Sequence, residues 1–193
     1  MSKYFYHGIR NGFVAPDTVI DIFKSGGIKS RRLQRISYKA GFNGPDYISI
    51  CRKEADTEYD EVKNNAFKNY ILDSFCFIIS DDIPAVKCDY VPETQEWDRF
   101  QLYKFMNEHP DIRITDMFDE WQVKDEIKFS NIIGIGIPTN WISKMYNAGF
   151  TNIRALVSKI ITLASEYQLD IVDSSVPNFI ELYEKEKNKK VKK

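Results

Sequence analysis

Short apolar runs, separated by polar turns, predict strands along the first two thirds of the chain. Such runs, rich in aromatic and β-branched side chains, fit pleated strands better than helices. The run SFCFIIS is apolar at nearly every position, which is typical of a buried strand. The predicted strands are 3–7, 47–51, 74–80, 119–124 and 131–137.

Other segments repeat their apolar residues at helical spacing. Pro16 and Asp17 suit the first turn of a helix, and the pair Gly26-Gly27 suits its end. The stripe of Ile, Leu and Val along 152–167 predicts a helix with one buried face. The spacing also predicts helices over 93–108 and 139–147, and a last helix that opens at Pro177.

Strands and helices alternate irregularly, without the βαβ rhythm of a doubly wound sheet. The order predicts an α+β fold with antiparallel pairing. The chain has 193 residues, which suits one domain, and we assign 1–184 to it. The Lys-rich segment 185–193 is predicted to be a disordered tail. Loops or short helices are expected over 29–39 and 54–69, and a turn at 43–45.

Composition narrows the class of protein further. Apolar residues make up 43% of the chain, enough for a sizeable core. The three cysteines, Cys51, Cys76 and Cys88, have neither the number nor the spacing of a disulfide framework or zinc site, so we expect plain thiols and no metal. The polar, aromatic opening does not resemble a signal peptide, and no apolar stretch is long enough to span a membrane. We expect a cytoplasmic protein; an effector exported without such a signal would look the same.

Charge is unevenly distributed along the chain, although the net charge is −1. Residues 1–53 carry ten Lys and Arg against three Asp and Glu, a balance of +7, whereas residues 54–128 carry eight against nineteen, a balance of −11. A basic lobe facing an acidic one would hold an anionic ligand on one side. The alternative is an ordinary solvated surface.

Only two side chains titrate near neutral pH, His7 and His109. His109 precedes Pro110 in a polar segment, where we expect an exposed imidazole. His7 ends an aromatic strand and is followed by Gly8, which lets a ligand or another backbone come close. The structural alternative is a half-buried imidazole bonded to a backbone carbonyl.

Three segments of sequence between residues 6 and 135 resemble ADP-ribosyltransferase-like proteins. The first, YHGIRNG followed by VIDIFKSGGIKSRR, resembles the family's opening, in which a strand ends in His or Arg before Gly and a helix ends at a Gly-Gly turn. The second, DYISI, is similar to a conserved strand that carries a Ser-rich segment or a Tyr. The third, DEWQVKDEIKFSNIIGI, is similar to the strand that carries the catalytic Glu.

The resemblance implies a split antiparallel sheet with flanking helices and a helical C-terminal segment, and NAD as the substrate. Glu120 falls on the catalytic position. A carboxylate there stabilises the cationic ribose that forms as nicotinamide leaves, and accepts a proton from the nucleophile. Position 118 is Phe118, so the chain lacks the Glu or Gln that precedes the catalytic residue in members that modify protein side chains. The implied NAD-binding residues are His7 and Gly8 for the ribose and amide, Tyr47 or Ser49 for nicotinamide, and Arg31 or Arg32 for the pyrophosphate.

The implied reaction is transfer of ADP-ribose to a macromolecular acceptor, with release of nicotinamide. The acceptor is either a protein or a nucleic acid. Two alternatives remain. One is an NAD glycohydrolase toxin on the same fold, which transfers to water, and the other is a non-catalytic interaction module.

Overall fold

The computed structural model describes residues 3–34, 46–53, 70–87 and 120–191. Several expectations lie outside these ranges: the turn at 43–45, the segment 54–69, the helix over 93–108, and the side chains of Cys88 and His109. The described residues form a mixed α/β structure with a mainly antiparallel sheet.

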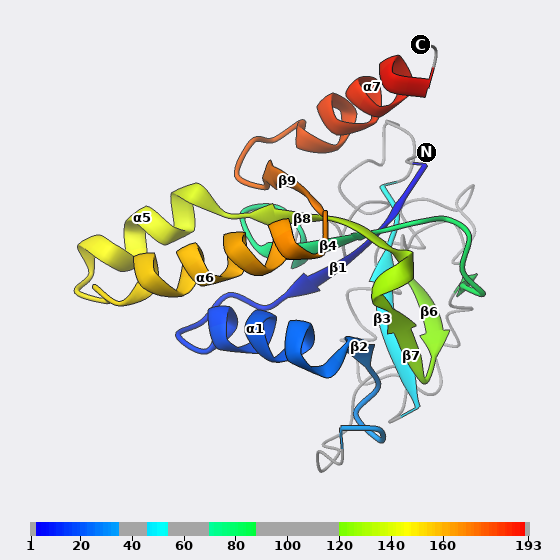
Figure 1. Cartoon of the computed structure of the whole chain (residues 1–193), viewed down its shortest axis with the longest axis horizontal. Coiled ribbons are helices and arrows are strands. Elements are labelled where there is room, and N and C mark those ends of the chain that lie inside the picture. The colour runs from blue at the N-terminus through cyan, green and yellow to red at the C-terminus, as the bar shows by residue number, and fades with distance from the viewer. Residues whose placement is uncertain (1–2, 35–45, 54–69, 88–119, 192–193) are drawn as a thin grey trace, which may run out of the picture.

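Seven strands form the main sheet in the order β5-β6-β3-β1-β4-β8-β9 (Figure 1). All neighbours are antiparallel except β8 and β9, which are parallel. The strands are β1 (Phe5–Ile9), β3 (Tyr47–Cys51), β4 (Phe75–Ile79), β5 (Val86–Lys87), β6 (Glu120–Lys124), β8 (Ile132–Ile137) and β9 (Asp170–Asp173).

A second sheet pairs β2 (Gly27–Lys29) with β7 (Glu126–Lys128). Only Asp125 separates β6 from β7, and its φ of 65° gives the sharp bend that carries the chain from one sheet to the other. Its N–H donates to the Asp46 carbonyl at 2.8 Å, and its carbonyl accepts the Ser30 N–H at 2.7 Å. Asp125 therefore joins the end of β2 to the start of β3. The 3₁₀ helix η3 (Phe129–Asn131) connects β7 to β8.

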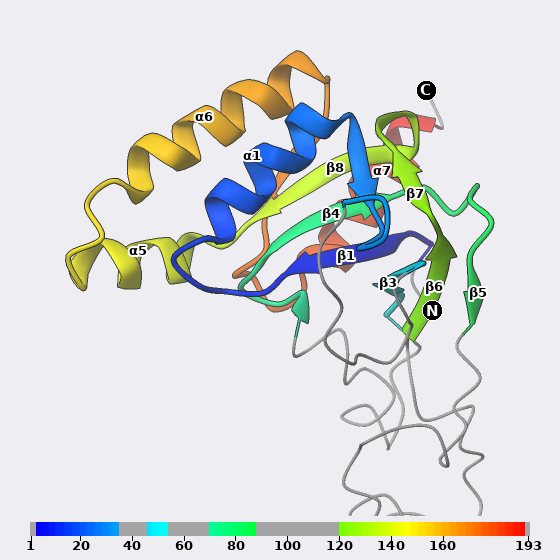
Figure 2. The same cartoon turned by 90° about the horizontal axis from the view of Figure 1, so that it is seen from below.

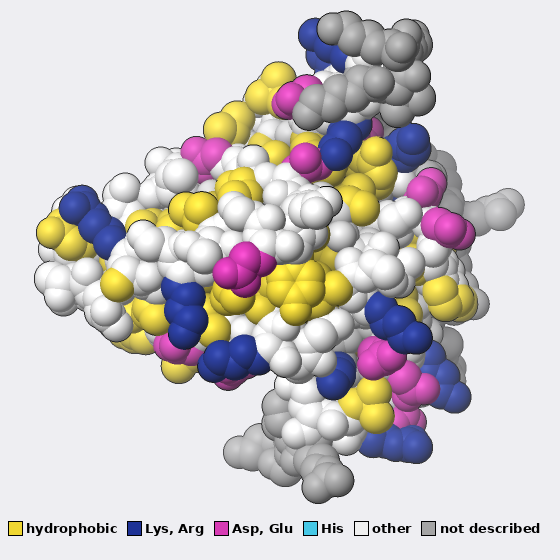
Figure 3. All heavy atoms as spheres, in the orientation of Figure 1, with side chains coloured by type: hydrophobic (Ala, Val, Ile, Leu, Met, Phe, Trp, Pro, Cys, Tyr) yellow, Lys and Arg dark blue, Asp and Glu magenta, His cyan; other side chains and the backbone are white. Residues whose placement is uncertain are grey.

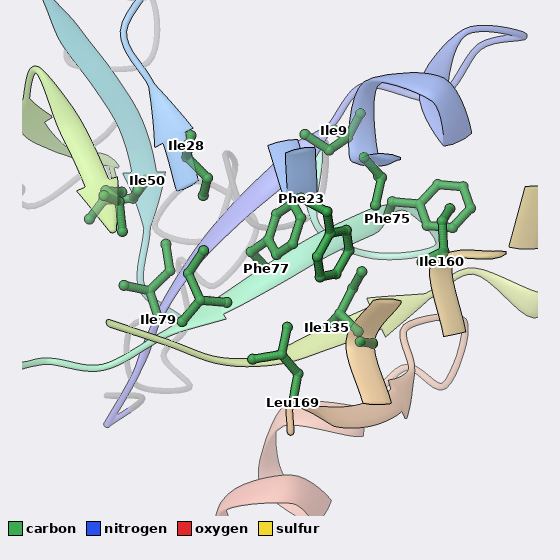
Figure 4. Packing of buried hydrophobic residues seen from close by; sticks show 14 of the residues in the cluster. Ile9, Phe23, Ile28, Ile50, Phe75, Phe77, Ile79, Ile135, Ile160 and Leu169 are labelled. Carbon is green, nitrogen blue, oxygen red and sulfur yellow. The ribbon is translucent and has the colours of Figure 1, made fainter. Parts of the chain in front are cut away.

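Helices cover both faces of the main sheet. On one face lie α1 (Ala15–Ser25) and α6 (Ile153–Glu166), with α5 (Thr139–Asn147) preceding α6 (Figure 2). Phe23 of α1 and Ile160 of α6 pack against Phe75, Phe77 and Ile135 of the strands (Figure 4). On the opposite face, α7 (Phe179–Val191) packs Phe179, Ile180 and Tyr183 against Tyr6, Cys51, Cys76 and Ile78. Buried apolar side chains of this size each contribute about 1.5–3 kcal/mol.

The predicted disorder of the tail 185–193 is wrong as far as Val191, because α7 continues to that residue. Tyr183 anchors the helix through a 2.8 Å hydrogen bond to Oδ2 of Asp170 on β9, and Lys187 forms an ion pair with the same carboxylate. Lys and Glu are also good helix formers, so the polar composition does not stop a helix that is anchored in this way.

Four short strands were not predicted: β2, β5, β7 and β9. β9 pairs with β8 in parallel, whereas the sequence predicted antiparallel pairing. Cys51 and Cys76 are both buried, and neither is part of a disulfide. No helix within the described ranges is long and apolar enough to cross a membrane.

Candidate functional site

The three segments singled out in the sequence lie on three neighbouring strands. His7 and Gly8 are on β1, Tyr47 and Ser49 on β3, and Glu120 opens β6. Tyr6 pairs with Cys51, and Cys51 pairs with Glu120, so one line across the sheet joins positions 6, 51 and 120. Two interstrand spacings separate the outer positions, about 10 Å. Segments far apart in sequence therefore meet within reach of one small ligand.

The sheet opens between β1 and β3. β1 pairs with β4 over five residue pairs, and β3 with β6 over five, but β1 and β3 share only the pair Tyr6 and Cys51. Beyond that pair the two strands diverge, and Figure 1 shows β3 and β6 running steeply away from β1 and β4. The split has a closed end at Tyr6 and an open end toward Ile9 and Tyr47.

His7 bridges the split at its first open position. The Nδ1 atom lies 2.8 Å from the Ser49 carbonyl oxygen. A carbonyl only accepts, so Nδ1 carries the proton and the neutral ring keeps an acceptor at Nε2. Burial lowers the pKa of His7 below its usual range, and the hydrogen bond to Ser49 offsets part of that effect. The imidazole is therefore neutral at pH 7, as a hydrogen-bond acceptor requires.

The pleat divides the candidate residues between the two faces of the sheet. Phe5 and Ile9, the alternate neighbours of His7, belong to the core under α1 and α6. Ile48 and Ile50 belong to the same core, so Tyr47, Ser49 and Cys51 lie on the opposite face. Paired positions of an antiparallel sheet share a face. The backbone register thus puts position 120 on the face of Ser49, while His7 reaches the split from the other face.

Gly8 is in contact with another backbone. A Cβ atom at this position would lie 1.9 Å from the Tyr70 carbonyl oxygen and 3.1 Å from Cδ1 of Ile71. Of the two explanations that the sequence left open for this glycine, close approach of a ligand or of a backbone, the second describes this structure.

Ser49 lies closer to position 120 than Tyr47 does. Ser49 pairs with Gln122, two residues along β6 from Glu120, whereas Tyr47 pairs with Lys124, four residues along. At the usual rise of a strand these offsets correspond to roughly 7 and 13 Å. Of the two residues proposed for nicotinamide, Ser49 is the better placed.

The arginine pair lies at the open end of the split. Nη1 of Arg32 lies 2.9 Å from Oδ1 of Asp46, the residue before β3, while Arg31 is exposed beside it. Ser30 precedes the pair and was not singled out in the sequence. It is 1% exposed, and its hydroxyl has no hydrogen-bond partner among the described residues. Nothing in the sequence distinguishes such a serine from an exposed one.

An aromatic cluster that the sequence did not indicate packs the closed end. The guanidinium of Arg52 lies 3.9 Å from the ring centroid of Phe5 and 5.5 Å from that of Trp121. The two rings meet edge to face at 5.3 Å. Cation–π contacts of this kind hold β1, β3 and β6 together just where the ladder between β1 and β3 ends.

Comparisons with models of protein families, with characterised proteins and with solved structures find no match to this chain. Over the ranges that the structure describes, no group of three or more His, Cys, Asp or Glu residues is arranged to hold a metal ion.

Proposed function

We propose that the chain is an NAD-dependent ADP-ribosyltransferase, which moves ADP-ribose to a macromolecular acceptor and releases nicotinamide. In this proposal the ligand lies across the split between β1 and β3. His7 holds it from one face of the sheet, Ser49 from the other, and Glu120 is the catalytic carboxylate. Arg31 and Arg32, at the open end, pair with the pyrophosphate.

One observation carries the proposal: His7, Ser49 and Glu120 lie on three consecutive strands of a sheet that opens at His7. A ligand that enters such a split meets unpaired strand edges and a neutral imidazole whose Nε2 accepts a hydrogen bond, for example from a ribose hydroxyl. This agrees with the order of residues that the resemblance to ADP-ribosyltransferase-like proteins implies.

The proposed reaction breaks the bond between C1′ of the ribose and the nicotinamide nitrogen. The bonding electron pair goes to the pyridine ring, which leaves as neutral nicotinamide, and the positive charge develops on the ribose. The Glu120 carboxylate stabilises that charge. The acceptor oxygen or nitrogen then bonds to C1′, and its proton passes to Glu120.

The Tyr70 carbonyl favours a second candidate, the non-catalytic interaction module. It occupies the space beside Gly8 into which a ligand would reach from that face of the sheet. A fold that has lost its substrate would fill the space in this way. Turnover of NAD decides between the two proposals, because only the first requires it.

The test compares nicotinamide release from NAD by the full chain and by Glu120→Gln. The matched control is Glu126→Gln, which makes the same chemical change on the neighbouring strand β7. We expect the chain and the control to release nicotinamide and Glu120→Gln to lose at least about a hundredfold in rate, the usual contribution of a general base. Equal rates for all three proteins would contradict the role of Glu120.

A second arm adds cell lysate to the same reaction. Release that needs lysate indicates transfer to a macromolecule, whereas equal release without lysate indicates hydrolysis. No release in either condition by a folded chain would favour the interaction module.

A further inference from the structure

The face of the sheet that carries Ser49 is open to solvent on the strands beside position 120. On this face Tyr47 of β3 pairs with Lys124 of β6. Gln122 of β6 pairs with Ser49 of β3 on one side and with Val86 of β5 on the other. Tyr47 is 39% exposed and Val86 is 62% exposed; Ser49 and Lys124 are also exposed, and Gln122 is half-buried. We call this set the outer face: Tyr47, Ser49, Val86, Gln122 and Lys124.

Basic side chains lie at the edge of the outer face, together with acidic ones. Lys124 lies on it, and Arg32, which is exposed like its neighbour Arg31, pairs with Asp46, the residue that precedes Tyr47. The neighbouring acidic groups, Asp46, Asp125 and Glu126, are only half-exposed, and Asp46 is paired with Arg32. Figure 3 shows basic and acidic side chains interspersed around the lower ends of β6 and β7. These basic residues are exposed, whereas the acidic residues beside them are half-exposed.

We propose that the outer face binds single-stranded nucleic acid. An exposed aromatic ring on an open antiparallel sheet is a stacking surface for a base, and a cation next to it suits the phosphate that follows. Tyr47 supplies the ring, Lys124 on the paired strand supplies the cation, and Gln122 offers a polar group to base edges. An acidic protein would find the same cations, but only a nucleic acid alternates planar bases with phosphates and so uses the ring and the cation together.

The position of the outer face gives the bound strand a role. It adjoins position 120, and Tyr47 lies about 13 Å along the strands from that position, a distance that roughly four stacked nucleotides span. A strand stacked on Tyr47 would therefore extend toward the proposed catalytic carboxylate. The role of this strand as the acceptor rests on the proposed function; the binding itself does not.

Fluorescence anisotropy with short labelled oligouridylate and oligothymidylate tests the binding without NAD. We expect the full chain to bind at least one of them, Tyr47→Phe to bind equally well, and Tyr47→Ala to bind about tenfold more weakly, as loss of one stacked base predicts. Lys124→Ala should weaken binding and reduce the slope of log affinity against log salt by about 1. The control is Lys159→Ala, an exposed lysine on α6, which should bind like the unaltered chain.

Two results would overturn the proposal: no saturable binding of either oligonucleotide, or equal binding by Tyr47→Ala and the unaltered chain. Absence of oligonucleotide binding would leave a protein as the acceptor. Preference for one oligonucleotide identifies RNA or DNA as the ligand. The assay contains no NAD, so it tests binding separately from the reaction. If the chain binds the oligonucleotide but does not turn over NAD, the proposed reaction is contradicted and nucleic-acid binding by the outer face is supported.

Discussion

The Nδ1 atom of His7 donates a hydrogen bond to the Ser49 carbonyl oxygen, 2.8 Å away, across the point where β1 and β3 separate. The bond takes the place of a ladder hydrogen bond between the strands and fixes the imidazole tautomer. Structure and proposed chemistry thus depend on the same side chain, and the two roles can be separated by substitution.

His7→Asn should keep the fold and lose the chemistry. An asparagine amide can donate to the Ser49 carbonyl as Nδ1 does, but it offers no acceptor at the position of Nε2. We expect the free energy of unfolding to change by less than about 1 kcal/mol, while nicotinamide release falls at least tenfold. His7→Ala should lose both stability and nicotinamide release. Urea unfolding and nicotinamide release measure the two properties, and equal stability losses in both variants would argue against the bridging hydrogen bond.

The low pKa of His7 should make the protein less stable in mild acid. Since the folded pKa lies below the unfolded value of about 6.5, the unfolded chain takes up the proton first as the pH falls. The contribution of His7 to the free energy of unfolding is complete above about pH 6.5. As the pH falls toward the lower folded pKa, this contribution declines by at most about 1.4 kcal/mol per pH unit. Unfolding at pH 7.5 and pH 5 should show a larger loss for the unaltered chain than for His7→Asn. A larger loss of stability in His7→Asn would contradict the lowered pKa of His7.

The contact between Gly8 and Tyr70 predicts a strong preference for glycine. An added methyl group would meet the Tyr70 carbonyl at 1.9 Å, so Gly8→Ala must displace backbone and should cost at least about 2 kcal/mol of stability. Gly12→Ala is the matched control, because nothing lies within 4 Å of its added methyl group. Thermal unfolding compares them; similar melting temperatures would show that Tyr70 does not pack on Gly8.

The thiol of Cys76 should be inert in the folded protein. Burial raises its pKa to about 12, although a hydrogen bond with the Gly136 backbone acts in the opposite direction. We expect iodoacetamide at pH 8 to leave Cys76 unmodified in the native chain and to alkylate it in urea, as judged by peptide mass spectrometry. Rapid native alkylation would contradict the burial of β4.

The apolar pattern predicted the longer elements well, because their own side chains determine them. The strand 47–51 and the helix 139–147 were predicted to the residue, and β4 and α6 to within one or two residues at each end. The strands β2, β5, β7 and β9 contain two to four residues of mixed polarity. Segments that short form strands because a partner is present, so no local pattern reveals them.

The candidate site was predictable in its residue types but not in its geometry. The sequence indicated His7, Ser49 and Glu120 by their order along the chain. It did not indicate that His7 reaches the split from one face while Ser49 lies on the other. Which face a strand residue occupies depends on long-range register, and a shift of one residue would exchange the faces. The choice of Ser49 over Tyr47 likewise needed the pairing of β3 with β6.

Imidazole NMR of the ¹⁵N-labelled chain tests the central claim most directly, because the sequence contains only two histidines and His109→Gln leaves His7 alone. At pH 7 the account predicts a neutral ring protonated at Nδ1, whose Nε2 resonance shifts when NAD is added. A His7 spectrum that shows the opposite tautomer, or that does not change at millimolar NAD, would contradict an NAD site at the split between β1 and β3.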